Sequence, residues 1–174
     1  MIQRVCNHTA LLVVGMAVGA VLTAGFHGLT SMPRAHAVAT DSSENFAIAT
    51  GLVDENIEAL YFLDFLTGDL RAAVVSRRNA QFTGVFQYNV LQDFEVTSEK
   101  PRFLMVTGIA GLPRGRGASQ IGRSLIYVAE ASSGQVAAYA LPYNSTLNAA
   151  GAPQMGTFLK VASGSFRDAF VRDE

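Results

Sequence analysis

The side chains that most often carry catalysis or bind metals lie in one part of this sequence. His8, His27 and His36 are the three histidines, and Cys6 is the single cysteine. All four precede residue 40. Without that segment, neither a Ser-His-Asp or Cys-His arrangement nor a His/Cys metal site can form. The sequence therefore predicts no catalytic residue of these types, no metal site and no cofactor.

The segment before residue 40 is typical of an export signal. Arg4 precedes an unbroken run of apolar, Gly and Thr residues over 10–26, and two overlapping small-x-small sites follow within 35–39. This order is that of a signal peptide. The run is also near the lower length limit of a membrane-spanning helix. We expect residues 1–39 to be a signal peptide or an N-terminal membrane anchor, and the protein to be periplasmic or otherwise associated with the cell envelope.

The remaining residues, 40–174, have the length of one domain. They keep 11 of the 13 basic residues, since Arg4 and Arg34 precede them, and all 14 acidic ones, for a net charge of −3. A mildly acidic domain does not favour nucleic acid as a partner. Because it contains no cysteine, its apolar core must stabilise it without disulfides.

Carboxylates are the main reactive groups that remain, and a pair of them could support glycoside hydrolysis. The candidates are Asp54, Glu55, Glu58, Asp64 and Glu130. The run Asp54-Glu55-Asn56 is expected to form a solvated turn between two strands. A weak Ca²⁺ site and a catalytic role are the alternatives, although EF-hand spacing is missing.

A second distinctive segment, residues 111–123, is rich in glycine and contains no acid. It carries Arg114, Arg116 and Arg123. Arginines on a glycine-rich backbone could hold a phosphate, a sulfated sugar or a lipid headgroup. The segment lacks the Gly-Lys-Ser/Thr of a P-loop. The alternative is a flexible hairpin loop without a ligand.

An internal repeat organises the domain. Residues 46–52 resemble 103–109, and residues 60–75 match 126–141 at an offset of 66. In each hairpin an acid precedes a Thr-Gly or Ser-Gly turn, where it can accept backbone N–H groups while glycine supplies positive φ. The predicted turn-capping residues are Asp64, Thr67, Gly68, Glu130, Ser133 and Gly134.

Each repeat, about 46–75 and 103–141, is predicted to form three antiparallel strands. Between them, Phe82, Phe86, Val90 and Phe94 recur every four residues, which predicts an amphipathic helix over 80–94. The fold class expected is mainly β: two antiparallel three-stranded blade-like sheets, related by internal duplication, with this one helix between them. A loop is expected over 144–156 and a further strand over 157–162.

The hairpin around Asp64, Thr67 and Gly68 resembles the blade hairpin of quinoprotein-type (PQQ-like) β-propellers, in which an aspartate, two spacers and Thr-Gly precede a Trp. That Trp position falls on Ala72 and Ala138, and the chain contains no Trp. The resemblance therefore implies blade-like sheets but neither the family's cofactor nor its site residues. The whole chain also resembles small exported bacterial proteins of uncharacterised activity.

Together these features predict a non-enzymatic structural or protein-interaction module of the envelope. Because sheets leave pairing edges, we expect a homo-oligomer or docking to an envelope partner, with membrane contact through residues 10–26 if these are retained. One alternative is a binding module for anionic polysaccharide or lipid that uses residues 111–123. The other is a carboxylate-based hydrolase.

Overall fold

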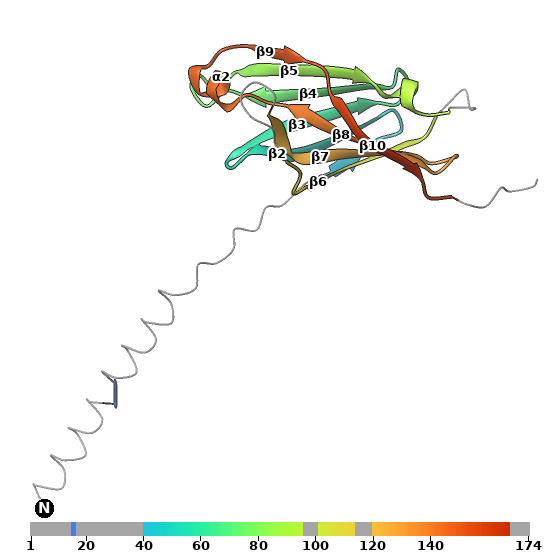
Figure 1. The fold of residues 1–174 in the computed structure, drawn as a ribbon, viewed down its shortest axis with the longest axis horizontal. Helices are drawn as coiled ribbons and strands as arrows, with labels where there is room; N and C mark the ends of the chain where they lie inside the picture. The colour runs from blue at the N-terminus through green and yellow to red at the C-terminus, as the bar shows by residue number, and fades with distance from the viewer. Residues whose placement is uncertain (1–14, 17–39, 96–100, 114–119, 168–174) are drawn as a thin grey trace, which may run out of the picture. The chain divides into compact units, whose positions relative to one another are not determined.

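A computed structural model describes residues 15–16, 40–95, 101–113 and 120–167 (Figure 1). The chain divides into two compact units, Met1–Ala37 and Val38–Glu174. Of the predicted leader or anchor, only Gly15 and Met16 are described, and both are helical. The rest of that prediction lies outside the described residues. The second unit contains the β-rich domain.

Within the described residues, ten strands form a six-stranded sheet, ordered β1-β2-β3-β4-β5-β9, and a four-stranded sheet, ordered β10-β8-β7-β6 (Figure 1). The prediction of a mainly β fold is confirmed. The prediction of two three-stranded sheets is wrong, because further strands extend both. The strands are β1 (Thr40–Ser42), β2 (Phe46–Asp54), β3 (Ile57–Asp64), β4 (Asp69–Val75), β5 (Phe82–Asn89), β6 (Phe103–Ile109), β7 (Ile121–Glu130), β8 (Gln135–Pro142), β9 (Gln154–Gly156) and β10 (Leu159–Ser165).

The predicted helix over 80–94 is wrong, and the segment is strand β5 followed by the 3₁₀-helix η1 (Val90–Asp93). Residues four apart also share one face of a strand, so the spacing of Phe82 and Phe86 fits both structures. The segment is rich in Phe, Tyr, Val and Thr, which favour strands, and Gly84 disfavours a helix. Pairing of β5 with β4, which places Phe86 opposite Ala72, decides the outcome.

The predicted loop over 144–156 contains regular structure. Helix α2 (Ser145–Ala150) begins where the Asn144 side chain accepts hydrogen bonds from the N–H groups of Thr146 and Leu147. Strand β9 follows and pairs in parallel with β5. The strand expected over 157–162 is β10, which begins and ends later than predicted.

The two repeats have the same internal geometry. In the first, Phe46 lies opposite Asp64 on β2 and β3; in the second, Phe103 lies opposite Glu130 on β6 and β7. The hairpins also agree in register, since Ala59 pairs with Val74 and, at the offset of 66, Leu125 pairs with Ala140. The sequence repeat is therefore also a repeat of strand pairing.

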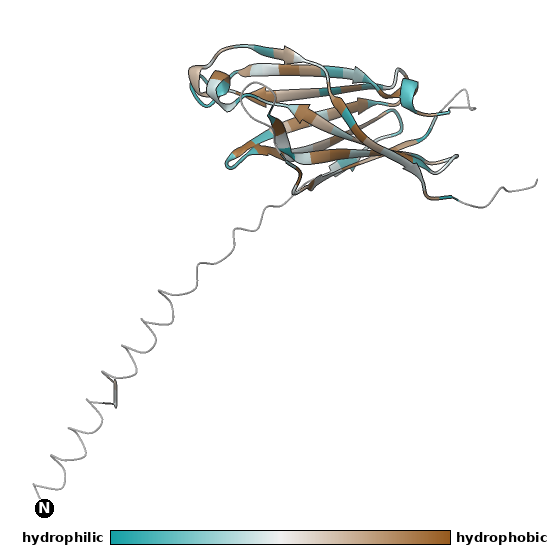
Figure 2. Cartoon of the chain, in the orientation of Figure 1, coloured by the Kyte–Doolittle hydropathy of each residue, from teal (hydrophilic) through white to brown (hydrophobic). Residues whose placement is uncertain are grey.

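The core lies between the two sheets, and Figure 2 shows apolar residues along the strands of both. Strand β2 approaches the second sheet closely. A Cβ at Gly51 would lie 3.0 Å from the Ser124 Cβ on β7, and the Thr107 hydroxyl donates to the Thr50 carbonyl at 2.5 Å. The largest fully buried side chains, from both sheets and the segments beside them, are Tyr61, Tyr139, Tyr143, Phe158, Leu63, Leu70, Ile126, Leu141, Val53, Val74, Val90 and Val128.

Removal of one buried hydroxyl should stabilise this core. The Tyr61 ring is fully buried, and within the described part of the chain its hydroxyl has no hydrogen-bond partner. Burying an unpaired polar group costs about 1–3 kcal/mol. We therefore expect Tyr61→Phe to raise the free energy of unfolding by about 1 kcal/mol in urea denaturation. Tyr127→Phe, at the matching position of the second repeat, is the control and should change little. A loss of stability in Tyr61→Phe would contradict the prediction.

Candidate functional site

Two turns of the same geometry occupy the same end of the two repeats. The Asp64 carboxylate accepts hydrogen bonds from the N–H groups of Leu66 and Thr67, at 2.8 and 3.2 Å. The matching acid, Glu130, accepts from Ser132 and Ser133, at 3.1 and 2.6 Å. Both carboxylates are therefore engaged in holding their turns.

The residues after each acid complete these turns. The Thr67 hydroxyl accepts from the N–H of Asp69, as the Ser133 hydroxyl does from that of Gln135. Gly68 and Gly134 adopt φ of 71° and 72°. Positive φ is a conformation that glycine adopts without the steric cost of a Cβ. The six predicted turn-capping positions thus form two equivalent hydrogen-bonded turns.

Arg123 is the described member of the three candidate ligand-binding arginines; Arg114 and Arg116 lie outside the described residues. Its guanidinium Nη1 lies 3.9 Å from the Glu55 Oε1. Both side chains are well exposed, so this ion pair is weak. Arg123 therefore remains accessible, although an acid lies beside it.

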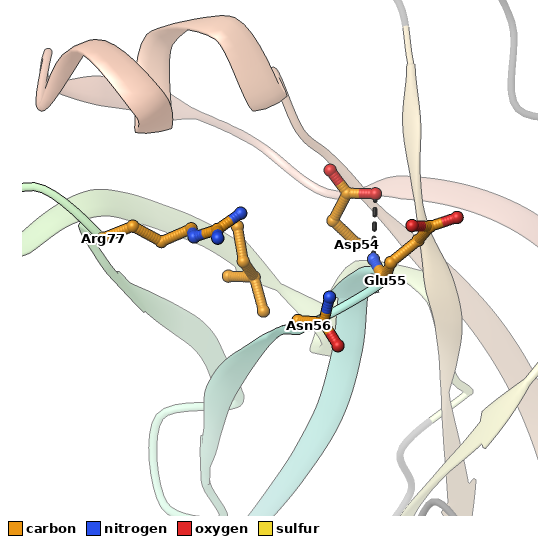
Figure 3. A pocket seen from close by; sticks show the side chains of 5 residues that line it. Asp54, Glu55, Asn56 and Arg77 are labelled. Atoms are coloured by element: carbon orange, nitrogen blue, oxygen red, sulfur yellow. Dashed lines mark hydrogen bonds between the residues drawn. The ribbon is translucent and has the colours of Figure 1, made fainter. Parts of the chain in front are cut away.

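The turn at Asp54-Glu55-Asn56 forms one wall of a small hollow of about 100 Å³. Ile57 and Arg77 complete the wall, and the Arg77 side chain extends towards the turn from the segment that follows β4 (Figure 3). The Asp54 carboxylate accepts the N–H of Glu55 at 2.9 Å. The hollow thus combines one cation with the two acids of a turn.

The carboxylates considered for hydrolysis are divided between the two ends of β3. Asp54, Glu55 and Glu58 lie at or near the turn that precedes it, whereas Asp64 ends it. Glu130 ends β7 in the same way. This arrangement separates the sequence candidates into a turn cluster and two turn caps.

Sequence reasoning missed a polar cluster that joins the two sheets at Asp93 of η1. Its side chain is only 5% exposed. One carboxylate oxygen accepts from the hydroxyls of Tyr88 and Tyr139, at 2.8 and 2.9 Å. The other accepts from the ammonium of Lys160 on β10, at 2.5 Å. Since Tyr88 belongs to the first sheet and Tyr139 and Lys160 to the second, Asp93 ties the sheets together.

The electrostatics of this cluster keep Asp93 ionised. Burial alone raises the pKa of Asp93, but hydrogen bonds from Lys160, Tyr88 and Tyr139 outweigh it and lower the pKa below its usual value. Burial, followed by the hydrogen bond to Asp93, raises the pKa of Tyr88 to about 12. The same causes raise the pKa of Tyr139. A carboxylate that stays ionised and accepts from three donors is suited to a structural role rather than to proton transfer.

Sequence reasoning also missed an apolar surface on the four-stranded sheet, on the side away from the core. Leu104 and Val106 of β6 are 63% and 55% exposed there. Leu125, Ala138 and Ala140 are buried in a small second apolar cluster on the same side, with Ala110, Ile121 and Tyr127 packed against them. We call this surface the outer apolar face, and cross-strand pairing defines its members: Leu104, Val106, Gly108, Leu125, Tyr127, Ala129, Val136, Ala138, Ala140, Leu159, Ala162 and Gly164.

The sequence did contain a signal for this surface. Residues 103–109 and 135–142 are apolar at nearly every position rather than at alternate ones. A strand with one solvated face alternates apolar and polar residues, whereas a continuous apolar run is typical of a strand covered on both faces. These strands therefore carry apolar residues on a second face that the core does not use.

Comparisons with known proteins add no family to this geometry: no family model, curated protein or solved structure matches the chain. In the described ranges, no group of three or more His, Cys, Asp or Glu side chains is placed to hold a metal ion. In those ranges, no helix has the length and apolar character needed to cross a membrane.

Proposed function

We propose that this chain is an exported, non-enzymatic module of the cell envelope that assembles with itself or docks to a larger envelope component. The observation that carries the proposal is the outer apolar face. Apolar patches of roughly 300 Å², the size of this face, are often functional on soluble proteins. The sequence features of residues 1–39 support export, followed by cleavage or by retention of residues 10–26 as an anchor.

The engagement of the polar side chains supports a structural role. Asp64 and Glu130 are occupied by backbone N–H groups, and Asp93 by two tyrosines and a lysine. Groups held in this way stabilise turns and the contact between sheets. The stable scaffold then presents apolar surface to a partner.

Purification from native envelopes, with intact mass and solution mass measured on the same sample, tests the proposal. We expect a defined processed or full-length mass together with an oligomer or a stoichiometric complex. A monomer without a partner at high concentration would contradict it. Heparin and anionic lipid vesicles should leave the melting temperature unchanged, because a ligand specific to the native state would raise it. A rise that is lost on replacing Arg114, Arg116 and Arg123 with Ser would favour the anionic-ligand alternative.

A further inference from the structure

The two repeats bury opposite faces, which reveals how they pack. Tyr61 of the first repeat is fully buried in the core, whereas its counterpart Tyr127 lies on the outer apolar face. Conversely, Ile126 of the second repeat is fully buried, whereas its counterpart Leu60 is 41% exposed. Because the strand registers are equivalent, one face of the first repeat packs against the opposite face of the second.

This packing is directional. Two copies related by a symmetric face-to-face contact would bury the same residues, and each would leave the same face free. In this chain, by contrast, the two repeats are stacked with their equivalent faces turned in the same direction. Such a contact is heterologous, and it leaves two different free faces at the two ends of the stack.

The first free face is the outer apolar face of the second repeat. Its positions match those that the first repeat buries in the core: Tyr127 corresponds to Tyr61, Ala138 to Ala72 and Gly108 to Gly51. None of its twelve members is charged. Four strands about 4.8 Å apart and about five residues of about 3.4 Å each give a projected area of roughly 300 Å². The surface thus has the composition of a core face, and no further sheet of the described residues covers it, while Leu125, Ala138 and Ala140 are already buried within it.

The second free face belongs to the first repeat. Phe46 and Phe62 stack there with ring centroids 5.1 Å apart, and Leu60 and Val85 are exposed on the same side. Its members resemble those that the second repeat turns into the core, since Phe46 corresponds to Phe103. The further correspondences are Ile48 with Met105, Thr50 with Thr107, Leu60 with Ile126, Phe62 with Val128, Asp64 with Glu130 and Val75 with Leu141.

The match departs on the second and third strands of this face, and on the second the exposed Glu58 stands where the second repeat has the buried Ser124. Arg71 stands where the second repeat has Ala137, and Ala73 stands where it has Tyr139. The Arg71 guanidinium contacts Asp69 on its own strand, at 3.2 Å. Arg71 lies between Phe62 of β3 and Gln87 of β5, so its charge interrupts the apolar area rather than bordering it. We therefore expect a weaker contact than the one inside the chain.

We infer that a second copy of this chain covers the outer apolar face, placing its own free first-repeat face on it and continuing the stacking of the repeats from one chain to the next. This inference rests on the proposed function and names the surfaces through which the module assembles. Heterologous contacts produce closed rings or open filaments, depending on whether the rotation closes.

Single charges on either face test the inference, in protein produced from the full 174-residue sequence and recovered as the cell processes it. Val106→Asp places a carboxylate in the outer apolar face, and Leu60→Asp places one in the free face of the first repeat. Leu66→Asp, in a turn outside both faces and 68% exposed, is the matched control. Light scattering gives the solution mass, and circular dichroism checks the fold. If Val106→Asp fails to fold, Leu104→Asp takes its place, and if Leu60→Asp fails to fold, Val85→Asp takes its place.

We expect the unmodified protein and Leu66→Asp to form oligomers whose mass rises with concentration, and each of the other two variants to be monomeric. An equimolar mixture of Val106→Asp and Leu60→Asp should form a dimer and nothing larger, because each partner retains the face that the other lacks. A monomeric unmodified protein would overturn the inference together with self-assembly. If only Val106→Asp prevents assembly and mixing restores nothing, like faces pair and the inference is wrong. If both variants assemble normally, the inference fails while the proposed function stands.

Discussion

Asp93→Asn should lower the free energy of unfolding by about 3 kcal/mol at pH 7, because it weakens the hydrogen bonds of two tyrosine hydroxyls to a charged group, each of which contributes about 1.5–3 kcal/mol. The replacement keeps the volume of the side chain but removes its charge. The asparagine oxygen can still accept from Tyr88 or Tyr139. Its amide group is a donor, however, and would face the ammonium of Lys160, which donates at 2.5 Å in the native protein. Urea denaturation monitored by circular dichroism measures the change.

Lys160→Met provides the matched control for this cluster. The Lys160 side chain is 41% exposed, so water can replace much of its contact with Asp93. Exposed ion pairs contribute about 0–1 kcal/mol, and we expect a loss in this range. Asp93 would keep both tyrosine hydroxyls. A loss in Lys160→Met as large as that in Asp93→Asn would show that the ion pair, and not the three-donor carboxylate, ties the sheets together.

The same cluster should give the stability a defined pH dependence. The folded-state pKa of Asp93 is lowered, so its contribution is present above the ordinary carboxylate pKa of about 4 and is lost as the pH falls through the folded value. The pKa of Tyr88 is raised to about 12, so its contribution is complete below the ordinary tyrosine pKa of about 10. It is lost as the pH rises through the folded value.

The difference in unfolding free energy between the native protein and Asp93→Asn isolates this effect from other carboxylates, such as Glu130. That difference should be nearly constant near neutral pH and should shrink in acid. Absorbance titration of tyrosinate should also show a lower pKa for Tyr88 in Asp93→Asn, with the part due to burial remaining. A difference that does not change between neutral and strongly acidic pH would refute the assigned role of the Asp93 charge.

The local parts of the fold were accessible from the sequence because they depend on neighbouring residues. An acid, a hydroxyl residue and a glycine within five positions suffice to define each turn, and the apolar runs beside them define the hairpins. The segment around Phe82 and Phe86 was not accessible in this way. A spacing of four is compatible with a helix and a strand, and long-range pairing with β4 selects the strand.

The tertiary features depend on how the sheets meet, which local patterns do not encode. Asp93, Tyr139 and Lys160 are far apart in the sequence and meet because η1, β8 and β10 converge. Likewise, the duplicated sequences suggested equivalent blades, yet Tyr61 and Tyr127 lie in different environments. Either face of each apolar strand could have entered the core, so the sequence left open which of them would stay outside.

The duplication also allows a matched test of the two turns. Gly68→Ala should cost about 3 kcal/mol, whereas Gly134→Ala should cost about 1–2 kcal/mol, the usual penalty of a left-handed residue with a Cβ. Both glycines adopt nearly the same positive φ, so the backbone penalty should be equal. Urea denaturation of the two variants measures the difference.

The neighbours of the two turns account for this difference. A Cβ at Gly68 would come within 2.4 Å of the Leu91 Cγ, and Leu91 is packed against the core. Asn89 holds that segment in place by donating to the Thr67 carbonyl at 2.8 Å. At Gly134 the Cβ would instead come within 2.5 Å of the Arg167 Cγ and 2.8 Å of its Cβ; Arg167 is exposed and lies beyond the end of β10, so this segment of the chain can shift as a whole. Overpacking against a fixed side chain adds about 1–3 kcal/mol to the backbone strain.

A double-mutant cycle separates the two contributions. Adding Leu91→Ala to Gly68→Ala should cost less than Leu91→Ala does alone, because the smaller side chain relieves the clash while leaving the backbone penalty in place. Adding Arg167→Ala to Gly134→Ala should show no such coupling. Equal losses for the two glycine variants, or a cycle without coupling at Leu91, would mean that η1 shifts freely. The packing of the first turn against Leu91 would then not hold η1 in one place and could not position Asp93.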